Sequence, residues 1–416
     1  MITSQTIDAS LLGSDRPQRD KLSIFLSKDE QGKLDVLLIV PLSPEIEPEK
    51  KAIDEFAPNR TLHVHYTVAM DLDAERSQLS ESFAKMYRNH PVKHRLLSKT
   101  LEPLPDDELR SAFTPIAAQG RSIYRRLFNP TSYADYDEND APLIRAVVLS
   151  ALKRDQIIVI KSPVSLFPWA FLYADEALNM DDQTTFDPAR FWGFRHILQT
   201  EIEGVSRRVL LDSPPRVIAA ICEEVDTTQE HRSGPLSDLE SAGRVSMEWV
   251  HSTAGLNSAL KDFQGDCLYF YGHVEHRERP TPTTSCVKLG GQKLTVEQID
   301  NAEGPKFAKD LVIAFLNGCE SAPPTVWNEA TVAGFLCLRG KHRVCCITTF
   351  AEVPGSFSAA LAQRFWEGFL TGRSLGEALL DARTALFNEY RSPLGLLYMI
   401  FGRAETRLRG GEDGGA

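Results

Sequence analysis

The chain has 416 residues, with 46 basic and 57 acidic side chains and a formal net charge of −11 at pH 7. An acidic chain of this kind binds polyanions poorly, which argues against nucleic acid as a direct partner. Apolar residues make up 42% of the sequence, enough for a sizeable core, and the length predicts two or three domains or one large domain with an extension.

No run of about 18 uncharged apolar residues occurs, so we expect no membrane-spanning helix. The N-terminus lacks a basic start followed by an apolar stretch, so we expect no secretory signal. The seven cysteines all lie between positions 222 and 346, their number is odd, and no Cys-x-x-Cys pair occurs. This pattern argues against a disulfide framework and a structural zinc site, and it predicts a cytoplasmic protein with reduced thiols.

Residues 1–103 are predicted to form a small N-terminal β-rich domain. Apolar or alternating segments at 22–27, 34–40 and 61–72 predict three strands. Residues 73–90 have helical spacing and an acidic start, which predicts a helix after the third strand.

The pattern changes to helices from residue 104 onward. Residues 106–128 predict a helix interrupted at Pro115, and residues 140–154 predict a second helix. Residues 156–162 then predict a buried strand, and a helix followed by an apolar strand is typical of an α/β layer fold.

Four further apolar runs predict strands covered on both faces, at 216–224, 267–272, 311–317 and 343–350. Helical segments lie between them, among them one predicted over 236–250, and a late strand is predicted within 394–402. This order predicts an α/β fold with a mostly parallel sheet flanked by helices. The polar, glycine-rich residues 407–416 predict a disordered tail.

Two of the predicted strands run into residues that can carry chemistry. The run 267–272 leads into His273, and the run 311–317 leads into Gly318 and Cys319. Reactive groups gather beyond the carboxyl ends of strands in open α/β sheets, so adjacent strands would bring both side chains to one rim. An imidazole there stabilises and steers the thiolate, which is the nucleophilic form of cysteine. The sequence therefore predicts a catalytic dyad of His273 and Cys319.

A glycine before the cysteine permits a sharp turn, and we expect the backbone N–H groups of Cys319 and Val274 to face a developing oxyanion. The cysteine follows the histidine by 46 residues, close to the interval of roughly 50 residues in caspases. The alternatives are a cysteine that is only a buried core residue and a histidine that is only a structural hydrogen-bonding group.

The segments DCLYFYGH (266–273) and DLVIAFLNGCESA (310–322) resemble the histidine and cysteine motifs of CHAT domains, which are caspase-like peptidases related to separases. Three later segments, 329–350, 365–383 and 392–402, resemble the next helices and strands of that family in the same order. Upstream, GRSIYRRLF and QIIVIKSPVSLFPWAFLY resemble its non-catalytic first half, so the resemblance covers roughly residues 110–404.

The resemblance implies a caspase-like fold over residues 104–406, with a non-catalytic, pseudo-caspase half at 104–212 and an active half at 213–406. It also implies a cysteine endopeptidase that uses His273 and Cys319 on a protein substrate. That chemistry needs no metal and no organic cofactor.

The chain departs from the pattern of the family at two positions. Val274 follows the histidine where the family usually has glycine, which keeps an amide N–H but brings a larger side chain to the site. Gly355 stands where separase-like enzymes have an acidic residue that receives a basic P1 side chain, P1 being the residue before the scissile bond. We therefore expect a weak or absent preference for arginine or lysine at P1, unless Glu352 turns into the substrate pocket and restores it.

Stand-alone members of this family are often encoded with immune partners, so the resemblance suggests a role in bacterial antiphage defence or programmed cell death. The first candidate substrate is a gasdermin-like pore former that is activated by cleavage, and a sensor protein is a candidate activator. A catalytically inactive CHAT-like interaction scaffold is the main alternative. A nucleotide-binding α/β protein is a weaker alternative, because no G-x-x-x-x-G-K-[ST] or G-x-G-x-x-G motif follows a strand.

Overall fold

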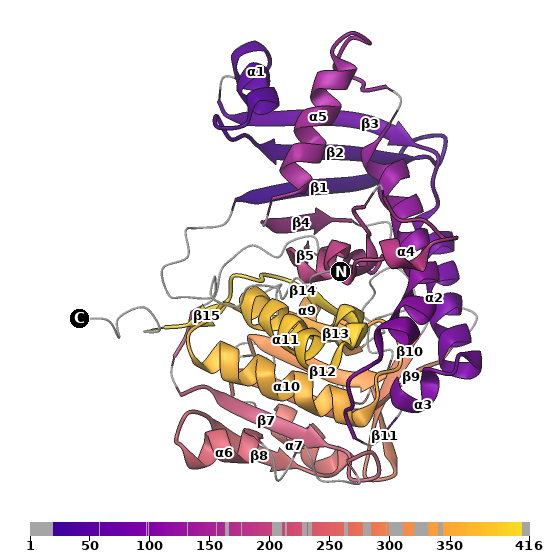
Figure 1. Cartoon of the computed structure of the whole chain (residues 1–416). Coiled ribbons are helices and arrows are strands. Elements are labelled where there is room, and N and C mark those ends of the chain that lie inside the picture. The colour runs from indigo at the N-terminus through magenta and orange to yellow at the C-terminus, as the bar shows by residue number, and fades with distance from the viewer. Residues whose placement is uncertain are drawn as a thin grey trace. The chain divides into compact units, whose positions relative to one another are not determined.

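The structure is a computed structural model that describes most of the chain between residues 20 and 409 (Figure 1). The described residues are 20–57, 59–96, 98, 100–130, 132–154, 156–162, 166–175, 177–201, 210–212, 214–226, 231, 235–261, 265–277, 284–296, 298, 311–319, 332–339 and 344–409. The chain divides into two compact units: unit 1 contains residues up to 90 together with 106–200, and unit 2 contains residues 91–105 and those from 201 onward.

Unit 1 is built on a sheet with the strand order β5-β4-β1-β2-β3. Its strands are β1 (Lys21–Lys28), β2 (Leu34–Pro41), β3 (Thr61–Val68), β4 (Ile157–Lys161) and β5 (Ile197–Glu201). β1 is antiparallel to β2 and parallel to β4, so the strands predicted within residues 1–103 share one sheet with the predicted strand at 156–162. The boundaries of the two units therefore do not coincide with the predicted domain boundary at 103/104.

Strict alternation explains how the first strands of unit 1 form. Every second residue of β2 is buried, beginning with Leu34, while the residues between them are half-buried, as expected for a strand with one face on a core. The helices of unit 1 are α1 (Glu47–Glu55), α2 (Leu72–Asn89), α4 (Asp106–Phe128) and α5 (Ala141–Leu152), with short 3₁₀ helices η2 (Trp169–Phe171), η3 (Gln183–Thr185), η4 (Pro188–Arg190) and η5 (Trp192–Phe194). α5 packs against β2 and α1, and this packing covers the buried face.

The predicted interruption at Pro115 is wrong, because α4 runs unbroken from Asp106 to Phe128. Proline removes one helical hydrogen bond and crowds the preceding turn, which by itself opposes a continuous helix. The residues on both sides of it, among them Phe113 and Ile116, are fully buried, and burial of this apolar stripe outweighs the local cost.

Unit 2 contains a sheet with the order β11-β10-β9-β12-β13-β14, in which β7 pairs with β9 and β8 pairs with β7. Its strands are β6 (Leu210–Leu211), β7 (Arg216–Ile221), β8 (Ser246–Val250), β9 (Cys267–Arg277), β10 (Thr284–Leu289), β11 (Gln292–Thr295), β12 (Ile313–Cys319), β13 (Cys345–Thr349), β14 (Tyr398–Phe401) and β15 (Arg407–Leu408). The five strands β8, β7, β9, β12 and β13 are mutually parallel, whereas β10, β11 and β14 are antiparallel to their neighbours. The predicted α/β class with a mostly parallel sheet is confirmed.

Helices cover both faces of the unit 2 sheet (Figure 1). The helices of unit 2 are α3 (Lys93–Leu96), α6 (Pro235–Ser241), α7 (Thr253–Lys261), α9 (Val332–Arg339), α10 (Gly355–Leu370) and α11 (Leu375–Tyr390), with the 3₁₀ helix η6 (Pro393–Leu397) before β14. The Cys346 thiol contacts the Ala333 carbonyl of α9, while the Asn317 amide reaches the Ser358 carbonyl of α10. Cys346 lies in register with Ala314, and Asn317 is an odd number of residues further along β12, so α9 and α10 lie on opposite faces.

The single helix predicted over residues 236–250 is wrong. The segment forms α6, which ends at Ser241, and then the edge strand β8. Gly243 adopts a φ of 68°, a left-handed conformation that glycine tolerates and that commonly ends a helix. The amide of Arg244 returns to the Leu239 carbonyl, which closes the helix end and releases the chain into β8.

The predicted disordered tail begins too early, because Arg407 and Leu408 form β15, which pairs in parallel with β6. Residues 410–416 of the predicted tail lie outside the described residues.

The end of unit 2 is held by a buried arginine on α11. Arg383 is 3% exposed, and its guanidinium donates to the carbonyls of Gly395 (2.9 Å) and Tyr398. Replacement of Arg383 by methionine keeps much of the volume but leaves two buried carbonyls without a charged donor. We expect the free energy of unfolding to fall by about 3 kcal/mol or more.

The matched control for Arg383 is Arg364 on α10, whose ion pair with Glu389 (2.7 Å) lies at the surface. We expect Arg364→Met to cost no more than about 1 kcal/mol. Denaturant unfolding of both variants measures the difference, and equal losses would contradict a structural role for the buried guanidinium.

Candidate functional site

The two residues predicted as a dyad lie side by side in the backbone of unit 2. β9 and β12 are neighbouring parallel strands, and their register pairs Cys319 with His273. Neighbouring strands are separated by about 4.8 Å, so the two backbones are as close as adjacent strands allow. The sequence alone does not establish that these two strands are neighbours, and the structure shows that they are.

The strand that carries His273 extends further than predicted. It was expected to end at residue 272, but β9 continues to Arg277 because β10 pairs with its second half in antiparallel register. β12 ends at Cys319, beside His273. His273 therefore lies within a strand, at the level where pairing with β12 stops.

Two close contacts hold the strand ends in place. The hydroxyl of Thr349 on β13 donates to the Gly318 carbonyl, and the amide of Cys222 donates to the Tyr271 carbonyl at 2.8 Å. A Cβ atom on Gly318 would lie 2.6 Å from the Gly272 carbonyl oxygen. Glycine is required at position 318 because the two strands approach too closely there for any side chain.

Val274 does not bring its side chain to the same side of the sheet as His273. Successive residues in a strand point to opposite faces, and a Cγ of Val274 lies 3.0 Å from the Cβ position of Gly318, on the other face. The larger residue after the histidine is thus accommodated over the glycine that precedes the cysteine.

The imidazole of His273 is exposed to solvent. Lys288 of β10 lies in register with His273 on the side away from β12, and its side chain is half-buried. Glu352 is exposed in the segment between β13 and α10. The side chain of Cys319 lies outside the described residues, so the structure gives its backbone position alone.

The other described cysteine side chains are core residues. Cys222, Cys267, Cys286, Cys345 and Cys346 are reduced thiols and all are buried. Burial raises the pKa of Cys345 to about 11 and holds the pKa of Cys267 well above its usual value. Thiols in such surroundings stay protonated and are poor nucleophiles.

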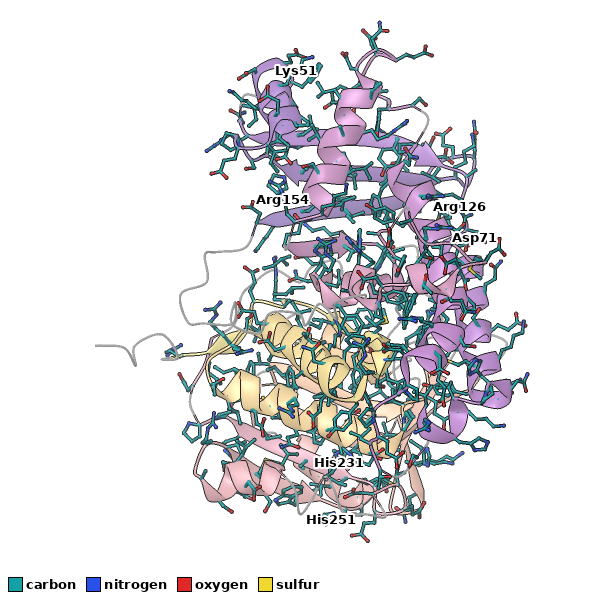
Figure 2. The ribbon with its side chains drawn as sticks, in the orientation of Figure 1. Lys51, Asp71, Arg126, Arg154, His231 and His251 are labelled. Atoms are coloured by element: carbon teal, nitrogen blue, oxygen red, sulfur yellow. The ribbon has the colours of Figure 1, made fainter. Side chains whose placement is uncertain are left out.

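Beneath the site, Tyr271 stacks on the imidazole of His231, with ring centroids 3.6 Å apart (His231 is labelled in Figure 2). The hydroxyl of Tyr271 lies 2.8 Å from where a Cβ on Gly355 would be. The Nδ1 atom of His231 lies 2.7 Å from the Tyr269 hydroxyl. His231 is 4% exposed, and burial lowers its pKa to about 3.

The burial of His231 predicts an acid-sensitive component of stability. In the unfolded chain a histidine has a pKa near 6.5, so between about pH 6.5 and 3 the unfolded chain binds a proton that the folded chain does not. The free energy of unfolding therefore falls as the pH drops through this window. His231→Gln keeps an acceptor for Tyr269 but does not titrate, so we expect a shallower fall in urea unfolding at pH 7, 5 and 4. Parallel curves for the two proteins would contradict this assignment.

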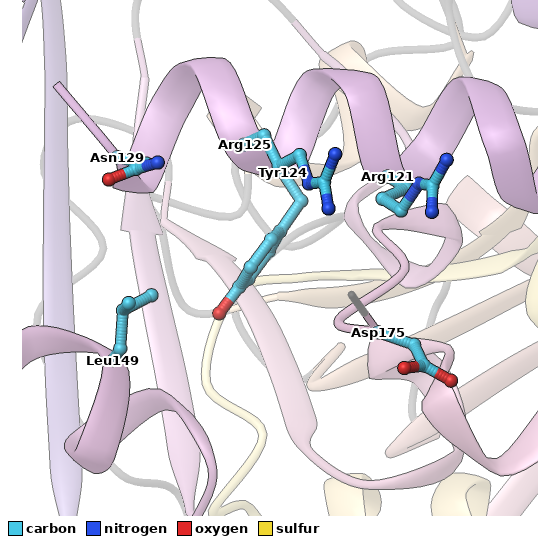
Figure 3. A pocket seen from close by; sticks show the side chains of 6 residues that line it. All are labelled: Arg121, Tyr124, Arg125, Asn129, Leu149 and Asp175. Carbon is cyan, nitrogen blue, oxygen red and sulfur yellow. The ribbon is translucent and has the colours of Figure 1, made fainter. Parts of the chain in front are cut away.

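Unit 1 has a pocket of about 280 Å³ that is separate from these residues, lined by Arg121, Tyr124, Arg125, Asn129, Leu149 and Asp175 (Figure 3). Arg121 donates to the Leu178 carbonyl, and Asp175 accepts from the Ala177 amide at 2.8 Å. Two of its charged groups are therefore engaged by the chain itself, and the pocket holds neither residue of the predicted dyad.

Within the described residues, no group of three or more histidine, cysteine or acidic side chains is arranged to hold a metal ion. None of the helices in the same part of the chain is both long and apolar enough to cross a membrane.

Sequence reasoning missed two features next to the dyad. The hairpin of β10 and β11 was not predicted, although the alternating residues 284–289 and Gly290-Gly291 are a strand-and-turn signal, and with it Lys288 was missed. Asn317 is the last residue of the apolar run 311–317, and a single amide in such a run signals a buried polar contact.

Comparisons with known proteins place the chain in a family. The chain is 27% identical over 256 residues to a probable protease of Vitiosangium sp. (strain GDMCC 1.1324), an alignment that covers 56% of this chain and 32% of that protein. Among solved structures, the Saccharomyces cerevisiae separase–securin complex matches with a TM-score of 0.47 and 12% identity, covering 94% of this chain and 30% of that one. The chain thus spans about a third of the length of the relatives that it matches. The model of the CHAT domain family matches residues 119–393, well over half of the sequence, and the chain therefore belongs to the CHAT domain family.

Proposed function

We propose that the protein is a caspase-like cysteine endopeptidase in which Cys319 is the nucleophile and His273 the general acid and base. The observation that carries the proposal is the register of β9 and β12, which pairs these two residues on adjacent parallel strands. Residues in register share a face of the sheet, so an imidazole and a thiol at these positions are within reach of each other.

The chemistry follows in two steps. The Cys319 thiolate attacks the carbonyl carbon of the scissile bond, a C–S bond forms, and the carbonyl electrons move to the oxygen. When this oxyanion collapses, the C–N bond breaks and His273 gives its proton to the leaving amine. His273 then takes a proton from water, the hydroxide attacks the thioester, and the C–S bond breaks to release the new carboxyl end and the thiolate.

The oxyanion would be stabilised by backbone N–H groups, for which Cys319 and Val274 are the candidates. Both sit at the level where β12 ends and β9 continues toward β10. Because the Val274 side chain lies over Gly318 on the opposite face, it leaves the His273 face clear for a peptide carbonyl.

One observation assigns the nucleophile, and a second favours catalysis over the alternative of an inactive scaffold. The five cysteines with described side chains are buried, so they leave the nucleophile to Cys319 or Cys337, and only Cys319 is in register with a histidine. His273 is exposed, whereas a purely structural histidine is usually buried and hydrogen-bonded, as His231 is. The similarity of the chain to a probable protease of Vitiosangium sp. also supports catalysis.

We further propose that the enzyme acts in the cytoplasm on a specific protein partner, with a gasdermin-like pore former as first candidate and a sensor protein as candidate activator, in antiphage defence or programmed cell death. This setting rests on the CHAT family membership. If a gene for a gasdermin-like protein lies beside the gene for this chain, the purified chain should cut that protein at one site.

A positional-scanning peptide library tests activity and P1 preference together. We expect cleavage without a strict requirement for arginine or lysine at P1, because Gly355 offers no acidic group and Glu352 is exposed. Strict P1 arginine would show that Glu352 or another acid lines the pocket. Absence of cleavage of the library and of every candidate protein, by a chain that is folded, would favour the scaffold.

A further inference from the structure

An amide side chain lies two residues before the nucleophile, on a strand whose described side chains are all buried. Asn317 is 1% exposed and is in register with Tyr271, just as Cys319 is in register with His273. Burying an amide is costly unless its donors and acceptor find partners, so the contacts of Asn317 show why it is there.

The amide of Asn317 makes three hydrogen bonds to buried groups. Its Oδ1 accepts from the Tyr398 hydroxyl at 2.7 Å, and its Nδ2 donates to the Tyr269 hydroxyl and to the Ser358 carbonyl, each at 3.0 Å. The side chain is therefore held in one orientation. Aspartate has the same shape but cannot donate to Tyr269 or Ser358.

These partners belong to three elements around the site. Tyr269 is on β9, which carries His273; Tyr398 is on β14; and Ser358 is in the first turn of α10. The Ser358 hydroxyl donates to the Gly355 carbonyl at 2.8 Å, so the network reaches the first residue of α10.

The protons of the network have one consistent arrangement. Tyr269 accepts from Asn317, so its own proton is free to go to His231 Nδ1, 2.7 Å away. His231 must then be neutral, in accord with its deep burial. Hydrogen bonds thus run from Asn317 on β12 to Tyr269 on β9 and on to His231, with Asn317 and Tyr269 as donors and His231 as the acceptor.

We propose that Asn317 is a positioning residue for the dyad: by bonding to β9, β14 and α10 at once, it keeps residues 273 and 319 level and the start of α10 in place. This inference rests on the proposed peptidase function. Displacement of a catalytic group by about 1 Å can cost on the order of 100-fold in rate, so a network that prevents a slip of β12 against β9 acts mainly on the chemical step.

The test uses Tyr398→Phe and Tyr269→Phe, each of which deletes one hydroxyl bonded to Asn317 and keeps the ring, together with Asn317→Asp. The control is Tyr66→Phe in unit 1, where an equally buried hydroxyl donates to the Leu127 carbonyl at 2.6 Å. kcat and KM are measured on a peptide that the wild-type protein cleaves, and unfolding in denaturant reports the stability of each variant.

We expect Tyr398→Phe and Tyr269→Phe to lower kcat by about tenfold or more with KM nearly unchanged, while Tyr66→Phe loses stability but keeps its kcat. Asn317→Asp should be worse than either, or should not fold. Wild-type kcat in both Phe variants would overturn the inference and leave the peptidase function intact. A wild-type protein that cleaves nothing and whose Cys319 reacts no faster with an alkylating agent than free cysteine would instead refute the proposed function and, with it, this role.

Discussion

Replacement of Cys319 by alanine is expected to abolish peptide cleavage, with kcat/KM lower by a factor on the order of 10⁴ or more, while the fold is retained. The thiolate is the only group that forms a covalent bond with the substrate in the proposed mechanism, so its loss removes the reaction path and not merely a binding contact. Cys319 is at the last position of β12, so loss of its sulfur leaves the pairing of β9 and β12 unaltered. Steady-state kinetics on a library-derived peptide measures the effect.

Two other cysteine variants serve as controls for Cys319→Ala. Cys286 is buried on β10, which pairs with the strand that carries His273, so Cys286→Ala changes a nearby thiol without touching the proposed nucleophile. Cys337 on α9 is the second control, because it is the one other cysteine whose side chain lies outside the described residues. Activity that survives in Cys319→Ala but disappears in Cys337→Ala would move the nucleophile to α9 and refute the dyad.

Replacement of Gly318 by alanine is expected to have the second largest effect. The new Cβ would lie 2.6 Å from the Gly272 carbonyl oxygen and 3.0 Å from a Cγ of Val274. A side chain could rotate away from the new methyl group, but a backbone oxygen of a central strand cannot. β12 must therefore move away from β9 just before Cys319. We expect a loss of about 1–3 kcal/mol in unfolding free energy and, because the dyad residues separate, at least about a 100-fold loss in kcat.

The control for Gly318 is Gly368 in α10, where an added Cβ would meet ordinary contacts, the nearest at 3.4 Å. Gly368→Ala should stabilise the protein by up to about 1 kcal/mol, because alanine is the better helix former, and should leave activity unchanged. Denaturant unfolding and kinetics on both variants decide the point. Full activity in Gly318→Ala would show that the dyad tolerates a shift of β12.

Much of the fold could be predicted because four parallel strands of unit 2 contain short apolar runs. β7, β9, β12 and β13 are covered on both faces, so an unbroken apolar sequence is what their surroundings demand. Because both residues follow predicted strands, His273 and Cys319 were expected to be neighbours. The register of β9 and β12 shows that their backbones are.

Other elements depend on tertiary contacts that no local pattern expresses. β8 lies at the sheet edge and alternates exposed with half-buried residues up to the buried Val250, and its sequence runs on from α6 with only Gly243 to mark the break. The second half of β9 is a strand because β10 pairs with it, and β10 in turn was not recognised. Pro115 is tolerated in α4 by burial, which local propensity does not contain.

The hydrogen-bond network around Asn317 also could not be predicted from the sequence. Tyr398 and Asn317 are 81 positions apart, and Ser358 joins them only because α10 packs across β12. Residue types alone mark Asn317 as unusual in an apolar strand. They do not say which side chains complete its hydrogen bonds.

The most direct test of the dyad is the rate at which iodoacetamide alkylates Cys319 near neutral pH, followed by peptide mass mapping, in the wild-type protein and in His273→Ala. An imidazole beside the thiol stabilises the thiolate, so Cys319 should react faster than every other cysteine in the wild-type protein and about tenfold or more slowly in the variant. Equal rates in the two proteins, or a Cys319 that iodoacetamide does not reach, would contradict the account.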